Sequence, residues 1–297
     1  MADPGTLDGY GVLVTGGGSG IGLACARRLV ADGAAVVVAG RSEERLKAAV
    51  AELEEASPGP GRVGLAAADV TDEARVAEAV AVAHQLGQAN GGGLRGVIAC
   101  AGGSETIGPL TLTALDRWNR TLATNLTGTF LAIKHSAPLM AAGGGGSIIG
   151  ISSIASSNTH RWFGAYGVAK AAIDHLCMLA ADELGASGIR VNSIRPGLVE
   201  TGLVTGLMGN QAVLEDYLAC TPLGRIGQPE DIADLARFLI GPESSWVTGQ
   251  TINADGGHSL RRGPDIRPLV EPIFGPDALR GLETRSSRAR VVPPADR

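Results

Sequence analysis

Short apolar runs alternate with longer amphipathic stretches over most of this chain, and that alternation limits its possible folds more than any other feature. Each run has the length and apolar content of a buried strand, and each stretch has apolar residues at helical spacing. Apolar strands separated by helices indicate a parallel sheet covered on both faces and connected by right-handed crossovers. The sequence therefore predicts an α/β fold, a doubly wound parallel sheet with helices on both faces.

The boundaries of these elements follow from the apolar runs and from capping residues such as Asp72. We expect strands over residues 10–15, 35–39, 63–68, 95–100, 147–152, 189–194 and 250–254. We expect helices over residues 20–32, 43–56, 72–86, 116–141, 165–186 and 229–240. Two glycine-rich stretches, 87–96 and 141–146, are predicted to be loops.

The composition of the 297 residues argues against several classes of protein. A net charge of −5 argues against binding to nucleic acid or to an anionic membrane. The four cysteines have no spacing typical of a metal site and fit idle thiols in a reducing compartment. The N-terminal residues lack the features of a signal peptide, and the longest stretch without Asp, Glu, Lys or Arg, 135–160, contains a proline and a glycine run. We therefore expect a cytoplasmic protein without a membrane-spanning helix or a bound metal.

A glycine-rich turn, Thr-Gly-Gly-Gly-Ser-Gly-Ile-Gly over residues 15–22, follows the first predicted strand and leads directly into a predicted helix. This order of strand, glycine turn and helix is typical of dinucleotide-binding sites. Glycine lets the backbone approach a pyrophosphate, which then lies at the positive end of the helix. The spacing is TGxxxGxG rather than GxGxxG, and a glycine-rich connection without a ligand is the alternative interpretation.

Further candidates follow the second and third strands, whose ends we expect at the same edge of the sheet. Gly40-Arg41-Ser42 lacks the acidic residue that often binds the ribose of NAD, and an arginine accommodates the 2′-phosphate of NADP. The sequence therefore favours NADP over NAD, although Arg41 also fits a solvated helix start. Asp69-Val70 follows the third strand, where Asp69 either accepts a hydrogen bond from the adenine amine or simply begins a helix.

Tyr166 and Lys170 have the spacing that places two side chains on one face of a helix. A tyrosine ionises near pH 10, and a neighbouring cation lowers its pKa, so we expect the pair to act as a general acid/base near neutral pH. Most Tyr-x-x-x-Lys pairs are surface neighbours, so the pair alone is weak evidence. It gains weight from Ser153, at the end of a predicted strand, and from Asn125 further upstream.

Together these motifs resemble those of the short-chain dehydrogenase/reductase family, which has a Rossmann-type fold. The resemblance covers about residues 8–260 and rests on the glycine turn, Asp69-Val70, Asn125, Ser153, Tyr166, Lys170, and Arg195-Pro196-Gly197 running on to Thr201. Segments 222–233 and 247–257 are also similar to the family's C-terminal segments. Where the family commonly has Asn-Asn-Ala-Gly, this chain has Ala99-Cys100-Ala101-Gly102, so both amide side chains are missing.

The resemblance implies a role for each matching residue. Tyr166 would exchange a proton with the substrate oxygen and Ser153 would hydrogen-bond that oxygen. Lys170 would hold the nicotinamide ribose and lower the pKa of Tyr166, and Asn125 would help to anchor a water. The residues implied to contact the dinucleotide are Gly16, Ser19, Gly20, Ile21, Arg41, Ser42, Asp69, Val70, Ala101, Gly102, Tyr166, Lys170, Val199 and Thr201. The resemblance also implies a homo-oligomer, a dimer or a homotetramer, built through helices 116–141 and 165–186.

We therefore expect an enzyme that transfers a hydride between NADP(H) and the carbonyl or secondary alcohol of a small-molecule substrate. Residues 202–220, which cover the substrate in this family, are mostly apolar and favour a lipophilic substrate. Arg161 fits either the attraction of an acidic substrate or a loop surface. Two other functions remain open: reduction of the conjugated C=C bond of an enoyl thioester, and dinucleotide binding without catalysis.

The alternation ends near Gly257, which divides the chain into a dinucleotide-binding and catalytic domain, residues 1–262, and a C-terminal extension, residues 263–297. Residues 261–297 contain eight arginines against five acidic residues and six of the 15 prolines, so we expect no further strand–helix–strand unit there. Apolar side chains among the prolines predict that at least residues 264–283 dock on the folded body or on a neighbouring subunit, near residues 202–220. A frayed end is the alternative.

Overall fold

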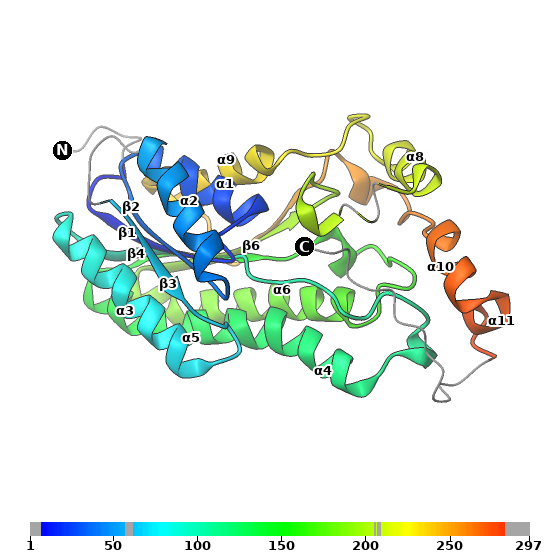
Figure 1. The fold of residues 1–297 in the computed structure, drawn as a ribbon. Helices are drawn as coiled ribbons and strands as arrows, with labels where there is room; N and C mark the ends of the chain where they lie inside the picture. Colours follow the sequence, from blue (N-terminus) through cyan, green and yellow to red (C-terminus); the bar gives the residue numbers. More distant parts are fainter. Residues whose placement is uncertain (1–6, 57–61, 205, 207–208, 283–297) are drawn as a thin grey trace.

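The computed structural model describes residues 7–56, 62–204, 206 and 209–282, which contain one sheet of seven parallel strands. The strands are β1 (Tyr10–Thr15), β2 (Ala35–Gly40), β3 (Val63–Ala67), β4 (Gly93–Ala99), β5 (Gly146–Ile151), β6 (Ile189–Pro196) and β7 (Thr251–Ala254). Their order across the sheet is β3-β2-β1-β4-β5-β6-β7, so the chain winds outward from the centre in both directions (Figure 1). The predicted doubly wound parallel sheet is confirmed.

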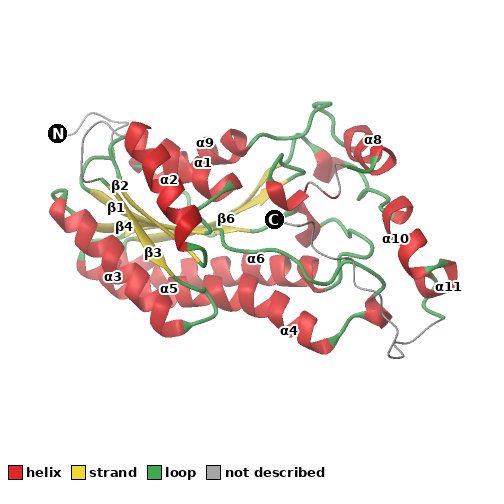
Figure 2. Ribbon diagram, viewed as in Figure 1, coloured by secondary structure: helices red, strands yellow, loops and turns green. Residues whose placement is uncertain are grey.

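Helices cover both faces of this sheet (Figure 2). One face packs against α1 (Gly20–Ala31), α2 (Glu43–Ala56) and α9 (Pro229–Ile240), and the other against α3 (Glu73–Ala89), α5 (Gly128–Ala142) and α6 (Ala165–Leu184). The remaining α-helices are α4 (Leu115–Leu122), α8 (Gln211–Cys220), α10 (Arg267–Phe274) and α11 (Pro276–Leu279). Within the described ranges, no helix is both long and apolar enough to cross a membrane.

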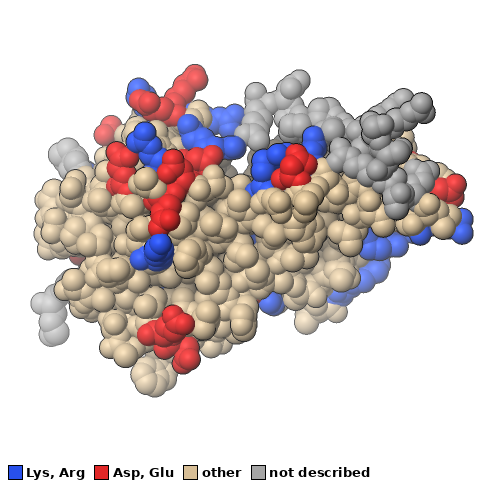
Figure 3. Space-filling view, turned by 90° about the horizontal axis from the view of Figure 1, so that it is seen from below, with Lys and Arg blue, Asp and Glu red and all other residues tan. Residues whose placement is uncertain are grey.

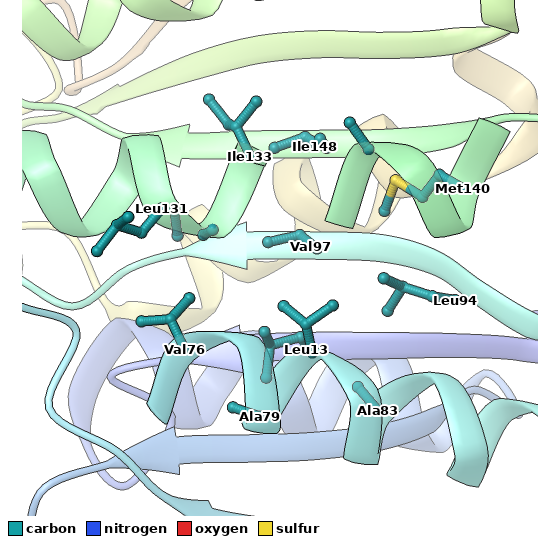
Figure 4. Packing of buried hydrophobic residues seen from close by; sticks show 14 of the residues in the cluster. Leu13, Val76, Ala79, Ala83, Leu94, Val97, Leu131, Ile133, Met140 and Ile148 are labelled. Carbon is teal, nitrogen blue, oxygen red and sulfur yellow. The ribbon is translucent and has the colours of Figure 1, made fainter. Parts of the chain in front are cut away.

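The core lies in two layers, one on each side of the sheet. Figure 4 shows part of the layer under α3 and α5, where Leu13, Val97 and Ile148 project from three strands. Small residues of α3, such as Ala79 and Ala83, let the helix lie close to the strands. Burial of this apolar surface is the main term that stabilises the fold.

The single helix predicted over 116–141 is interrupted. Residues Ala123–Thr127 form a π-turn between α4 and α5. Two side chains bond to the backbone there: the Asn125 amide donates to the carbonyl of Thr121 at 2.7 Å, and the Thr129 hydroxyl donates to the carbonyl of Asn125 at 2.7 Å. The apolar periodicity continues through the turn, so it does not reveal the change in hydrogen bonding.

The prediction of a loop over the glycine-rich stretch 87–96 is wrong in its extent, because α3 continues to Ala89 and β4 begins at Gly93. A Cβ atom at Gly87 would lie 2.7 Å from the carbonyl oxygen of Gly93 and 2.8 Å from the Cα of Gly11. The glycine therefore serves a close approach of α3 to the sheet rather than a turn. The second predicted loop, 141–146, is likewise shorter, since α5 ends at Ala142 and β5 begins at Gly146.

The described part of the C-terminal extension, residues 263–282, adds no strand to the sheet, and its helices α10 and α11 pack at the end of the molecule where α8 lies (Figure 1). Ile266 and Val270 of the extension are fully buried together with Val213 of α8. The docking predicted for residues 264–283 is confirmed over 264–282, and residue 283 lies outside the described residues.

We predict that Gly22→Ala destabilises the protein by about 1–3 kcal/mol, because the new Cβ would overlap the backbone carbonyl of Gly16. Gly18→Ala is the matched control in the same turn, since its Cβ would meet only Leu46 at 3.5 Å and Arg45 at 3.7 Å or beyond. Thermal and urea unfolding measure both variants. Equal stability of the two variants would contradict the close packing of α1 on the turn.

Candidate active site

The glycine turn holds two other segments against the start of α1. Gly16 has a positive φ of 69°, and a Cβ there would lie 2.9 Å from the Cα of Ala101. Gly20 also has a positive φ, of 54°, and a Cβ there would lie 3.2 Å from the Cγ2 of Thr201. Ala101 and Thr201, both predicted to contact the dinucleotide, therefore lie at the turn, although they are a hundred residues apart.

The N-terminus of α1 fits a pyrophosphate. Ser19 caps the helix in an extended conformation, is exposed, and makes no side-chain capping hydrogen bond. The first turn carries no acidic residue that would repel an anion. The first N–H groups of an α-helix have no partner within the helix, and its N-terminus is positive. The backbone of Ser19 to Gly22 thus offers donors and charge where the sequence predicts phosphate binding.

The adenosine side of the predicted site has one acidic and one basic group. Thr71 donates to one oxygen of Asp69 through its N–H at 2.9 Å and its hydroxyl at 2.8 Å. The Thr71 N–H bond, with a smaller effect of the Arg41 charge, lowers the pKa of Asp69, so its carboxylate stays ionised. Arg41 directly follows β2 and is exposed, and its contact with a ribose phosphate stays a prediction.

Sequence reasoning missed Arg45, which lies beside the glycine turn. The Cβ atom of Arg45 lies 3.7 Å from the position that a Cβ atom would take at Gly18. The backbone N–H of Arg45 donates to the Ser42 hydroxyl at 3.4 Å. The sequence did contain a signal for Arg45, because this arginine stands four residues after Arg41 at the start of a predicted helix. The site therefore has a second arginine near the predicted ribose position.

Ser153, Tyr166 and Lys170 come together at the ends of β5 and α6. Tyr166 and Lys170 lie in the first two turns of α6, and the Lys170 Nζ is 5.5 Å from the centre of the Tyr166 ring. The Ser153 side chain lies near enough to the Tyr166 hydroxyl to lower its pKa, and its own hydroxyl accepts from the Ala155 N–H at 3.1 Å. The Lys170 Nζ donates to the carbonyl of Ile151 at 2.7 Å, which holds the ammonium under the tyrosine. The structure therefore brings these three predicted side chains together.

The predicted direction of the Tyr166 pKa is wrong. Burial raises the pKa of the Tyr166 hydroxyl above its usual value, and the hydrogen bond with Ser153 only partly offsets this. Burial also lowers the pKa of Lys170 to about 8, against the opposing effects of Cys100 and Asp174. The reason is that both groups lose water when the site folds, which the sequence spacing does not report. At neutral pH, Tyr166 is a neutral acid above a lysine that is still mostly charged.

Asn125 is completely buried and braces the loop that follows β4. Its amide donates to the carbonyl of Gly103 at 2.7 Å, and its carbonyl oxygen accepts from the Gly103 N–H at 3.2 Å. A Cβ at Gly102 would lie 3.1 Å from the Lys170 Nζ, so the braced loop passes directly over the lysine. The anchoring of a water by Asn125 stays a prediction.

The departure at Cys100 is compensated by Thr15 at the end of β1. The buried Thr15 hydroxyl accepts from the backbone N–H groups of Cys100 at 3.1 Å and Ala101 at 3.2 Å. The ends of β1 and β4 are therefore tied without the missing amide side chains. Burial raises the pKa of the Cys100 thiol to about 11, so it stays neutral near Lys170.

Two further predicted residues are placed but not tested as ligands. Val199 is buried and pairs with Gly227 in an isolated bridge, and Val70 packs against Gly128. Their contacts with a cofactor stay predictions. Over the described part of the chain, no three His, Cys, Asp or Glu side chains are grouped as a metal site would need.

Comparison with known proteins identifies relatives that match almost the whole described chain. Residues 16–259 match a family model described as enoyl-(acyl carrier protein) reductase. The solved structure of a short-chain type dehydrogenase/reductase from Mycobacterium ulcerans is 52% identical to this chain, with a TM-score of 0.89, and the match covers 94% of this chain and 100% of that one.

Two other relatives have names that describe a substrate or a cofactor. The 2,5-dichloro-2,5-cyclohexadiene-1,4-diol dehydrogenase of Sphingobium indicum is 37% identical over 84% of this chain and 97% of its own length. The crystal structure of a gluconate 5-dehydrogenase from Burkholderia cenocepacia, in complex with NADP and tartrate, is 32% identical with a TM-score of 0.79, over 87% of this chain and 98% of that one.

Proposed function

The chain belongs to the short-chain dehydrogenase/reductase family and is an oxidoreductase, and from this premise we propose that it interconverts a ketone and a secondary alcohol using NADP(H). The observation that carries this proposal is the grouping of Ser153, Tyr166 and Lys170 at the sheet edge that also holds the glycine turn. A protein that only binds a dinucleotide has no need for this arrangement.

The side chains of the site supply a proton and a charge. The Tyr166 hydroxyl donates its proton to the carbonyl oxygen of the substrate, while the Ser153 hydroxyl donates a hydrogen bond to the same oxygen. The Lys170 ammonium stabilises the phenolate that remains on Tyr166. The hydride would come from NADPH in reduction and would pass to NADP in oxidation, with the cofactor held by the glycine turn and by Lys170.

The positions of the groups favour carbonyl chemistry over the reduction of an enoyl thioester. The neighbouring hydroxyls of Ser153 and Tyr166 suit one shared oxygen acceptor. Enoyl reduction is supported by the description of the matched family model alone. A cyclic ketone and crotonyl-coenzyme A, each tested for NADPH consumption, discriminate the two reactions.

The cofactor and the substrate class rest on separate observations. Arg41 and Arg45 near the predicted ribose position, together with the absence of an acid at the end of β2, support NADP, and one relative is solved with NADP. The mostly apolar residues 202–220 and the cyclohexadiene-diol dehydrogenase relative support a lipophilic, carbocyclic substrate.

We also propose a closed symmetric oligomer, a dimer or a tetramer. Phe130 of α5 and Val168, Met178 and Leu179 of α6 are each more than two-fifths exposed, which is unusual for large apolar side chains on paired helices. Figure 3 shows that the underside of the molecule carries its charged side chains in a few groups, separated by broad uncharged areas.

Catalysis depends on the Tyr166 hydroxyl in this proposal. Tyr166→Phe should lower kcat for ketone reduction by about 10²–10⁴, because it removes the proton donor and keeps the ring. The Kd of NADPH should change by less than about twofold, since the ring packing is retained. Tyr10→Phe, at the opposite edge of the sheet, is the control and should leave both unchanged. Full activity of Tyr166→Phe would refute the assignment.

The pKa of Lys170 predicts the pH dependence of reduction. Lys170 is protonated below its pKa of about 8 and loses its charge as the pH rises through that value. The kcat/KM of ketone reduction should therefore be level from about pH 6 to 7.5 and fall by about tenfold per pH unit well above 8. Lys170→Arg keeps the positive charge at high pH. The kcat/KM of this variant should be lower overall, but it should not decline above pH 8. A level profile of the unaltered protein up to about pH 9.5 would contradict the role of Lys170.

Cofactor preference is predicted to depend on Arg41. Arg41→Asp places a negative charge beside the 2′-phosphate and removes a charge-assisted contact of about 1.5–3 kcal/mol, so the ratio of the Kd values of NADPH and NADH should rise more than tenfold. Arg27→Asp makes the same charge change on the exposed outer side of α1 and is the control. Tighter binding of NADH than of NADPH by the unaltered protein would overturn the NADP assignment.

A further inference from the structure

The C-terminal extension lies between two segments that border the catalytic residues. The match to the family model ends at residue 259, so the extension is an addition to the part that the family shares. Its helix α10 packs against α8, where Val213 and Tyr217 are buried with Ile266 and Val270. Figures 1 and 2 show α10 and α11 standing at the end of the molecule where α8 lies.

Polar contacts at Asp216 and Ala219 fix the start of the extension, and the two residues just before it, to α8. The Arg262 guanidinium donates to both carboxylate oxygens of Asp216, one of them at 2.8 Å. The backbone N–H of Asp265 donates to the same carboxylate at 2.5 Å. The Arg261 guanidinium adds a bond to the carbonyl of Ala219 at 2.5 Å. The end of the covering segment 202–220 is thereby fastened to the extension.

The other side of the extension rests on the loop after β4. The ring of Phe274 lies directly on Gly108, where a Cβ would be only 2.7 Å from its Cζ. The Gly108 N–H in turn donates to the carbonyl of Trp162 at 2.7 Å. Phe274 thus reaches across from α10 to the backbone that leads to the catalytic tyrosine.

Trp162 is held in a strained conformation by these contacts. It has a φ of 68°, the only positive φ of a residue other than glycine in the described part of the chain. The Arg161 guanidinium lies 4.7 Å from the centre of its ring and 3.4 Å from the Asp265 carboxylate of the extension. Arg161 is therefore engaged in packing, and a strained backbone near catalytic residues points to a function.

The strained loop leads directly to the reacting group. The Tyr166 N–H donates to the carbonyl of Phe163 at 3.1 Å, and the Phe163 ring centre is 6.2 Å from that of Tyr166. Trp162, Phe163 and Phe274 pack against the buried cluster of α8 and α10, yet none of the three is fully buried. Phe163 therefore keeps apolar surface beside the Tyr166 ring, and Trp162 and Phe274 add partly exposed apolar surface to the same cluster.

We propose that residues 264–282 form an apolar wall of the substrate site. In this site, Phe274 contacts the hydrocarbon ring of a carbocyclic substrate, and so does Trp162, which the extension supports. The inference rests on the proposed function, because it places the substrate oxygen at Tyr166 and Ser153. The extension then determines which hydrocarbon body the site accepts, while the family-wide residues perform the reaction.

The test compares two ketones on one sample, cyclohexanone and acetone, with NADPH. Phe274→Ala should lower the ratio of their kcat/KM values by about tenfold, through a higher KM for cyclohexanone with kcat little changed. Loss of folded protein cancels from this ratio, and the milder Phe274→Leu should show a smaller change in the same direction. Leu282→Ala, in the same extension but 65% exposed, is the control and should leave the ratio unchanged.

Binding of cyclohexanol at saturating NADPH, a pair that cannot react with each other, gives a calorimetric result that needs no turnover. Phe274→Ala should raise the Kd of cyclohexanol by about tenfold and Leu282→Ala should not. Binding with this pattern but without ketone turnover would support the wall and contradict the proposed function. The proposed wall would be refuted if cyclohexanol did not bind. It would also be refuted if Phe274→Ala changed neither the ratio of the two kcat/KM values nor the Kd of cyclohexanol.

Discussion

Parallel pairing of β1 with β2 and β4 is the constraint on which the candidate site depends. Thr15 lies in register with Ala39 on one side and with Ala99 on the other, so three strands end at one level. The N–H of Gly16 donates to the carbonyl of Ala39 at 2.8 Å and continues the pairing into the turn. Parallel strands end at the same edge of the sheet. The glycine turn, the segment at Arg41 and the loop over Lys170 therefore lie close together.

Burial then sets the chemistry of the residues that the sheet edge collects. A lysine in water would be fully charged and a tyrosine fully protonated over the whole neutral range. Removal of water moves the pKa of Lys170 down to about 8 and the pKa of Tyr166 up, so the charge of the lysine, not that of the tyrosine, changes near neutral pH. The hydrogen bond of Lys170 to Ile151 and the brace of Asn125 on Gly103 keep both groups in place.

The C-terminal extension shows how an addition outside a shared fold reaches the site. Its described residues, 263–282, add no strand to the sheet, and they pack on α8 and on the loop around Trp162 through both apolar and charged contacts. The catalytic residues are held at the edge of the sheet, and the extension is held by α8 and by the loop beyond that edge.

The sequence by itself determined the strands, most helices and the chemical groups of the site, because apolar periodicity and residue spacing report which face of each element is buried. The π-turn at Asn125, the packing role of Gly87 and the place of Arg45 were not visible in it, since each arises where segments distant in the chain meet or where hydrogen bonding changes within an unbroken apolar pattern. Only the tertiary structure decided the direction of the Tyr166 pKa and the contact of Phe274 with Gly108. The physical reason is that desolvation and long-range packing depend on everything surrounding a group, whereas spacing depends only on its neighbours along the chain.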